Sequence, residues 1–142
     1  MIKFVLILTK QGQTRLSHYY MPIELTERPT LEGDVIRRIL ARAPGQCSFL
    51  DYEDYKIVYR RYLALYFIIG IDDDENEVAT LELIHLIVET IDKYIPKVTD
   101  LDLMYNVEKM HMILDEMIMN GRVVETCKNK ILAPIQLMDS QR

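Results

Sequence analysis

The sequence predicts an α+β domain in which one antiparallel sheet comes first and most of the helices follow in the C-terminal half. Three observations support this fold class. The segment Ile2–Thr9 is almost continuously apolar, which is typical of a strand covered on both faces. A second β-prone stretch runs from Tyr55 to Ile71, and helical periodicity dominates after position 76. The expected order is β-β-α-β-β-β-α-α-α, with five strands in a single domain covering 1–142.

The first two strands form a predicted hairpin. Ile2–Thr9 is followed by a polar loop with one glycine, Lys10–Gln13. The next stretch, Thr14–Met21, is a less apolar strand that Pro22 helps to end.

The first helix is expected to begin at Thr26 as the N-cap, with Pro29 tolerated in the first turn. The segment Ala43-Pro44-Gly45 marks its end. One apolar stripe faces the core: Leu31, Val35, Ile36, Ile39 and Leu40.

Three further strands are predicted after this helix. Phe49–Tyr52 is short, and Glu53-Asp54 forms a tight turn. The stretch from Tyr55 to Ile71 is longer than a usual strand, so we expect two antiparallel strands with a break around Arg61-Tyr62.

Three helices are predicted in the C-terminal half. Asp74 and Glu77 are a capping pair for a helix over about 76–95, which Pro96 ends. Thr99-x-x-Asp102 opens the next helix, and Asn120-Gly121 stops it. A last short helix begins near 125, and Pro134 is expected to bend or interrupt it.

Composition narrows the function. The formal charge is −5 and the pI is about 5.2. A protein that neutralises phosphate groups needs an excess of basic residues, so nucleic acid is not an expected partner. Direct binding to anionic lipid is disfavoured for the same reason. Two cysteines without paired spacing, Cys47 and Cys127, indicate structural thiols in a reducing, cytoplasmic compartment. The N-terminal apolar run is too short to cross a bilayer.

Catalytic motifs are absent from the sequence. His18, His85 and His111 fall on different predicted elements, and none has the spacing of a metal ligand pair, so no metal and no cofactor are expected. Asp72–Asp74 is better explained as a solvated turn before a helix than as a cation loop. Cys47 is expected to be a buried structural thiol. The sequence therefore indicates a protein that is not an enzyme.

Apolar residues are crowded near the C-terminal end. Leu103–Met119 holds 11 apolar residues in 17, and one core stripe accounts for five of them. Four others point elsewhere on a helix: Met104, Met112, Ile118 and Met119. This second side is covered either by another helix of the same domain or by a partner subunit, and methionine suits a surface that docks a large partner.

The segment Ile57–Phe67, IVYRRYLALYF, resembles the signature of the small (sigma) subunits of adaptor protein complexes, the clathrin-adaptor small-chain family. The resemblance covers the whole chain, including MIKFVLILTKQGQTRLSHYY at its start. Finer details, such as KQGQTRLS and QCSF, are most similar to sigma subunits of the fourth adaptor complex.

The resemblance implies a longin-like (profilin-like) fold, a five-stranded antiparallel sheet flanked by helices. It also implies a heterotetramer in which a large adaptin subunit binds this chain directly, beside a second large (beta-type) subunit and a medium (mu) subunit. Such complexes act in vesicle-mediated protein transport, here on the cytosolic face of trans-Golgi network and endosomal membranes, with membrane contact made only through the complex. The alternative is a free-standing longin-domain regulator of membrane fusion or tethering.

In related sigma subunits, acidic dileucine signals in cargo tails bind partly on the sigma subunit itself. By resemblance, Arg15 attracts the acidic residue of the signal. The pocket for the leucines is implied for Tyr62, Leu63, Leu65, Val88, Val98 and Leu103, with Lys97 at its rim. Leu63 stands where a small Ala is usual, and Lys97 replaces an Asn. From the residues alone, Val88, Val98 and Leu103 fit an ordinary core equally well, and Arg15 fits a solvated strand position.

Overall fold

The computed structural model describes residues 1–42 and 48–141. The strands of its main sheet are β1 (Ile2–Thr9), β2 (Thr14–Tyr19), β3 (Phe49–Tyr52), β4 (Tyr55–Tyr62) and β5 (Leu65–Ile71). The helices are α1 (Arg28–Leu40), α2 (Glu77–Tyr94), α3 (Asp100–Tyr105), α4 (Val107–Met117) and α5 (Lys128–Ser140), and a small hairpin is formed by β6 (Ile118–Met119) and β7 (Arg122–Val123).

The five long strands form one antiparallel sheet in the order β2-β1-β5-β4-β3. The first strand therefore lies near the middle, between β2 and β5, which explains why Ile2–Thr9 is apolar on both faces. The predicted α+β class and the five-stranded antiparallel sheet are confirmed.

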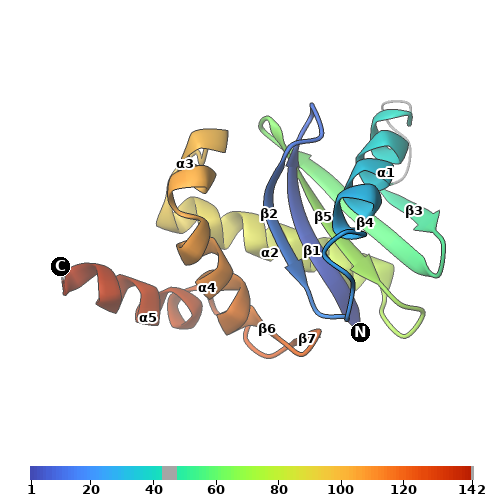
Figure 1. The fold of residues 1–142 in the computed structure, drawn as a ribbon. Helices are drawn as coiled ribbons and strands as arrows, with labels where there is room; N and C mark the ends of the chain where they lie inside the picture. Colours follow the sequence, from blue (N-terminus) through green and yellow to red (C-terminus); the bar gives the residue numbers. More distant parts are fainter. Residues whose placement is uncertain (43–47, 142) are drawn as a thin grey trace.

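Helices cover both faces of the sheet. Figure 1 shows α1 alone on one side, while α2 and α4 lie on the other and α5 carries the C-terminus away from the strands. Alternation along β1 divides the core accordingly: Phe4, Leu6 and Leu8 pack under α1, whereas Val5 and Ile7 face the larger helical layer.

The α1 face includes one close contact between neighbouring strands. A Cβ built on Gly70 of β5 would lie 2.3 Å from the ring of Phe4 on β1, and the two residues are paired across the strands. Glycine is required here because the aromatic ring occupies the space of a side chain. The Phe4 ring also makes an edge contact with Tyr55 of β4, at 5.9 Å between ring centroids.

The predicted long helix from Thr99 to Asn120 is wrong in its middle and at its end. Thr99 and Asp102 do form the predicted capping box. Asn106 then leaves the helical conformation, and its side-chain amide donates to the carbonyl of Asp102 at 2.9 Å, so α3 ends and α4 begins. Ile118 and Met119 belong to the hairpin β6–β7 instead of a helix.

Several expected boundaries are also corrected. The N-cap of α1 is Glu27, not Thr26, and the N-cap of α2 is Asn76, whose side chain accepts from the backbone N–H of Ala79. The turn between β4 and β5 lies at Leu63-Ala64, after the expected break. Helix α5 continues through Pro134.

Burial corrects two further expectations. Leu40 is exposed because it lies at the end of α1, where the stripe has left the sheet. Cys127, which was expected to be a structural thiol, is free and exposed at the N-cap of α5. Cys47 and the segment Ala43-Pro44-Gly45 lie outside the described residues.

Candidate functional site

The eight residues implied for signal binding come from five parts of the fold that meet at one end of the sheet. Strand β2 carries Arg15, and the β4–β5 hairpin supplies Tyr62, Leu63 and Leu65. The remaining residues lie on α2, on the α2–α3 connection and on α3: Val88, Lys97, Val98 and Leu103. Leu65, Val98 and Leu103 belong to one core cluster, against which Tyr62 and Val88 pack.

Arg15 is held by a carboxylate of this chain. Its Nε donates to Asp100 Oδ1, and its Nη2 donates to Asp100 Oδ2 at 3.0 Å and to Gln13 Oε1 at 2.8 Å. The pair is bidentate, the geometry that makes an arginine–carboxylate contact strongest. It fastens β2 to the first residue of α3, so the cation is placed beside the apolar cluster but is already occupied.

Asp92 organises the other side of the site. Its Oδ1 accepts from the hydroxyl of Tyr62 at 3.2 Å and from the backbone N–H of Lys97 at 2.9 Å. Burial, with the hydrogen bond to Asp92, raises the pKa of the Tyr62 phenol above its ordinary value. Because Asp92 lies one helical turn beyond Val88, the same face of α2 presents both residues to Tyr62.

The apolar residues of the site lie at different depths. Leu65, Val98 and Leu103 are at most 1% exposed, whereas Leu63 is 55% exposed, and Tyr62 and Val88 are half-buried. Leu63 and Lys97 both have left-handed backbone, with φ of 55° and 54°. Left-handed φ in such residues is uncommon and strained, and here two of them flank one site.

The four residues expected at a partner interface are also separated by the structure. Met104 and Met119 are exposed, and Met112 packs partly against the core. Ile118 is 2% exposed and packs in this chain's own core, so its side chain offers little surface to a partner. Its position follows from the end of α4, which turns Ile118 inward in β6.

Two exposed apolar residues of α3 were missed. Leu101 and Tyr105 are 59% and 84% exposed and are spaced by four, so they share a helix face. The spacing of Leu101 and Tyr105 can be read from the sequence, but the prediction of one continuous helix assigns its apolar face to the core. Asp100 was also missed as the partner of Arg15, since 85 residues separate them.

Two histidines from different elements are in contact. His18 Nδ1 on β2 lies 3.1 Å from His111 Nδ1 on α4, and His18 Nε2 lies 3.8 Å from Asp115. Burial lowers the pKa of His18 below its ordinary value of 6.5; Asp115 opposes the decrease and His111 adds to it. Across the described residues, no group of three potential ligands is arranged to hold a metal ion.

Comparison with known proteins places the chain in a family. The whole chain, residues 1–142, matches the model of the clathrin adaptor complex small chain. The chain belongs to that family: it is a small chain of an adaptor complex in vesicle transport, and it is not an enzyme.

Within the family, similarity is high to particular relatives. The chain is 57% identical over 138 residues to the AP-4 complex subunit sigma of Arabidopsis thaliana, covering 97% of this chain and 96% of that protein. It is 50% identical over 139 residues to the AP-4 complex subunit sigma-1 of Homo sapiens, covering 98% and 96%. A chain in a homology model of the full-length AP-3 complex in a stretched open conformation superposes with a TM-score of 0.79 at 33% identity, covering 99% of this chain and 95% of that one.

Within the described residues, none of the helices is both long enough and apolar enough to cross a membrane.

Proposed function

We propose that this chain is the sigma subunit of an AP-4-type heterotetramer and that it contributes part of the binding site for acidic dileucine signals in cargo tails. Half or more of its residues are identical to those of two AP-4 sigma subunits over nearly the full length, which supports the choice of complex. Its partners are then a large adaptin bound directly, a second large (beta-type) subunit and a medium (mu) subunit. Membrane attachment at the trans-Golgi network or endosomes is supplied by the assembled complex.

The large-subunit interface is proposed for the exposed apolar side chains near the C-terminal half. Met104 and the two other exposed apolar residues of α3, Leu101 and Tyr105, supply one part, and Met119 in the β6–β7 hairpin supplies another. Side chains of this size, 51% to 84% exposed, contribute binding free energy only when another chain covers them.

The single observation that supports signal binding is the position of Arg15 beside the apolar cluster. The signal has one acidic residue followed at fixed spacing by two adjacent apolar side chains, so its receptor needs one cation and one apolar slot at matching separation. Arg15 is tied to Asp100, and Leu103 lies less than one helical turn further along α3. The cation is thus fixed to the helix that contributes Leu103 to the apolar cluster.

The depth of the apolar residues indicates how the leucines bind. Tyr62, Leu63 and Val88 are accessible and would be contacted first. Contact with Val98 and Leu103 requires the α2–α3 connection to shift outward, and this connection contains the left-handed Lys97. Burying two leucines contributes roughly 3–6 kcal/mol before the costs of ordering the peptide and opening the slot, so micromolar-class binding strengthened by membrane avidity is expected.

The test is binding of a fluorescent acidic dileucine peptide to the assembled heterotetramer, measured by anisotropy. Arg15→Gln and Val88→Asp are each expected to weaken binding, and Arg37→Gln, an exposed arginine on α1, serves as the charge-matched control. Replacement of the two leucines by alanine should remove binding to the wild-type complex. Equal binding by wild type, Arg15→Gln and Val88→Asp would refute the assignment of the signal site.

A further inference from the structure

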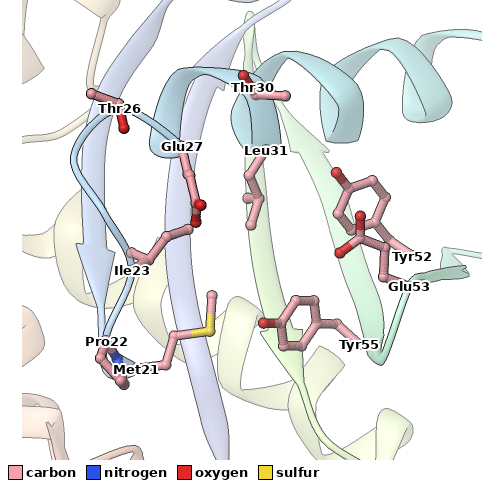
Figure 2. A pocket seen from close by; sticks show the side chains of 10 residues that line it. All are labelled: Met21, Pro22, Ile23, Thr26, Glu27, Thr30, Leu31, Tyr52, Glu53 and Tyr55. Atoms are coloured by element: carbon pink, nitrogen blue, oxygen red, sulfur yellow. The ribbon is translucent and has the colours of Figure 1, made fainter.

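A cavity lies at the end of the sheet opposite the signal site, on the face covered by α1. It has a volume of about 440 Å³ and is enclosed by the β2–α1 connection, the first turn of α1 and the β3–β4 turn (Figure 2). This volume falls within the range of pockets that hold small ligands or side-chain anchors. Strand β4 separates the cavity from the signal site, and its length places the two roughly 25 Å apart.

The floor of the cavity is apolar and already ordered. Leu31 and Tyr52 are buried, and Tyr55 is half-buried against the ring of Phe4. The Tyr52 hydroxyl donates to Asp34 Oδ2 at 3.0 Å, which fixes the ring in place. A ligand therefore meets a preformed surface and little ordering cost is incurred on binding.

The rim of the cavity is acidic. Figure 2 shows Glu27 extending from the start of α1 beside Ile23, and Glu53 on the β3–β4 turn beside Tyr52, with Leu31 drawn between the two glutamates. Glu53 adopts left-handed backbone with φ of 52°. Neither glutamate forms an ion pair with another described residue.

Among the described residues, those that line this cavity are neutral or acidic, so none of them neutralises these two carboxylates. The guanidinium of Arg38 lies 4.8 Å from the centre of the Tyr52 ring. Arg28, the next residue after Glu27, lines an adjoining hollow, and its guanidinium lies 4.7 Å from the centre of the Tyr19 ring. That hollow also contains Glu24, so it is lined by two carboxylates and one guanidinium.

We propose that this cavity binds a segment of another protein that places a lysine or arginine side chain between Glu27 and Glu53. Long basic side chains are suited to it because their aliphatic stems cover apolar surface while the charged end stays at the rim. An apolar residue beside the basic one fills the remaining space over Leu31 and Tyr55. Anionic lipid and nucleic acid are disfavoured by the rim carboxylates and by the net charge of −5.

The separation of the two sites has a consequence for cargo binding. A segment in this cavity does not overlap a signal bound near Leu63, because the two lie at opposite ends of β4. The chain can therefore hold a cargo tail and a basic segment of a second protein at the same time. Binding of a basic segment in this cavity does not depend on the dileucine assignment, whereas simultaneous binding of a cargo tail does.

The test selects peptides from a random display library on the assembled heterotetramer. The selected peptides are then synthesised, and their binding to the heterotetramer is measured by fluorescence anisotropy. The selected peptides are expected to contain lysine or arginine next to an apolar residue. Glu27→Gln combined with Glu53→Gln should weaken them about fivefold or more, and raised salt should weaken them as well. Glu108→Gln combined with Glu116→Gln, two exposed glutamates on α4, removes the same charge elsewhere and should leave binding unchanged.

A chain of the complex itself can be the occupant, and the same variants detect it. In that case the Glu27/Glu53 double variant should lower recovery of the large or medium chain in co-purification at raised salt, and the Glu108/Glu116 variant should not. The proposal is overturned if the selected peptides lack basic residues, or if they bind the Glu27/Glu53 variant as tightly as they bind the wild type. It is equally overturned if no peptide is selected and recovery of the other subunits is unchanged.

Discussion

Replacing Asp100 by asparagine is expected to strengthen the binding of an acidic dileucine peptide to the assembled complex. In the free site Arg15 is engaged by both oxygens of Asp100, so an acidic residue of the peptide competes with a carboxylate of this chain. The asparagine side chain keeps a similar shape but loses the charge. Arg15 then becomes available at a lower cost, and the gain should appear only for peptides that carry the acidic residue.

The size of the gain follows from the exposure of the ion pair. The side chains of Arg15 and Asp100 are 19% and 38% exposed, so solvent screens the pair and its contribution is about 0.2–1 kcal/mol, with bidentate geometry favouring the upper end. Each 1.4 kcal/mol is tenfold in affinity, which converts this range into a gain of roughly 1.4- to 5-fold. The gain should shrink as salt is added, because exposed charges are screened.

The assay is anisotropy titration of two labelled peptides that differ only in glutamate or glutamine at the acidic position. Asp74→Asn, an exposed acid beyond the end of β5, removes the same charge at a distance and should leave both affinities unchanged. The reasoning is refuted if Asp100→Asn leaves the glutamate peptide unchanged, or if it improves both peptides equally.

Three further predictions concern stability and assembly. Gly70→Ala should destabilise the chain by about 1–3 kcal/mol, because the added methyl group meets the Phe4 ring. Gly33→Ala in α1 should raise stability slightly, because nothing lies within 4 Å of the added carbon. Equal melting temperatures of the two variants in thermal denaturation would contradict the packing argument. The folded-state pKa of His18 is lowered below 6.5, so its contribution to stability is fully present above that pH and is lost as the pH falls through the lowered value. His18→Gln should therefore flatten the fall of the melting temperature below pH 6.5, and parallel curves for wild type and variant would argue against the lowered pKa of His18. Met104→Glu combined with Met119→Glu should reduce recovery of the large subunit in co-expression. The control is Leu25→Glu, at a leucine 74% exposed in the β2–α1 connection, which should leave recovery unchanged. Full recovery with the double variant would show that Met104 and Met119 are not part of the interface.

Much of the fold follows from local patterns. Ile2–Thr9 is predicted with both ends correct, because few other structures bury eight such residues in succession. Phe49–Tyr52 and the Thr99–Asp102 capping box are also predicted from short-range signals. These features depend on residues within a few positions of one another.

The errors arise where distant contacts or competing local bonds decide the structure. Asn106 breaks a helix that the apolar spacing continues, because its amide bonds to the Asp102 carbonyl. Ile118 has the spacing of an outward helical residue, yet the chain leaves the helix at that position and buries it.

The candidate site shows the same division. The resemblance supplies the residue types, and the structure brings Tyr62, Val88, Val98 and Leu103 to one end of the sheet. Neither the Arg15–Asp100 pair nor the His18–His111 contact can be read from the sequence, since each joins residues 85 or more positions apart. Side-chain depth, which separates accessible Leu63 from buried Leu103, is a property of the packed fold alone.

The proposal that this chain binds acidic dileucine signals is tested most directly by photo-cross-linking. A dileucine peptide with a photoreactive residue beside its leucines is irradiated on the assembled heterotetramer, and the cross-linked positions are mapped by mass spectrometry. The account predicts cross-links to this chain within the β4–β5 turn around Leu63 and the α2–α3 connection around Lys97, lost when the two leucines are replaced by alanine. Cross-links confined to other subunits, or to the cavity between Glu27 and Glu53, would contradict it.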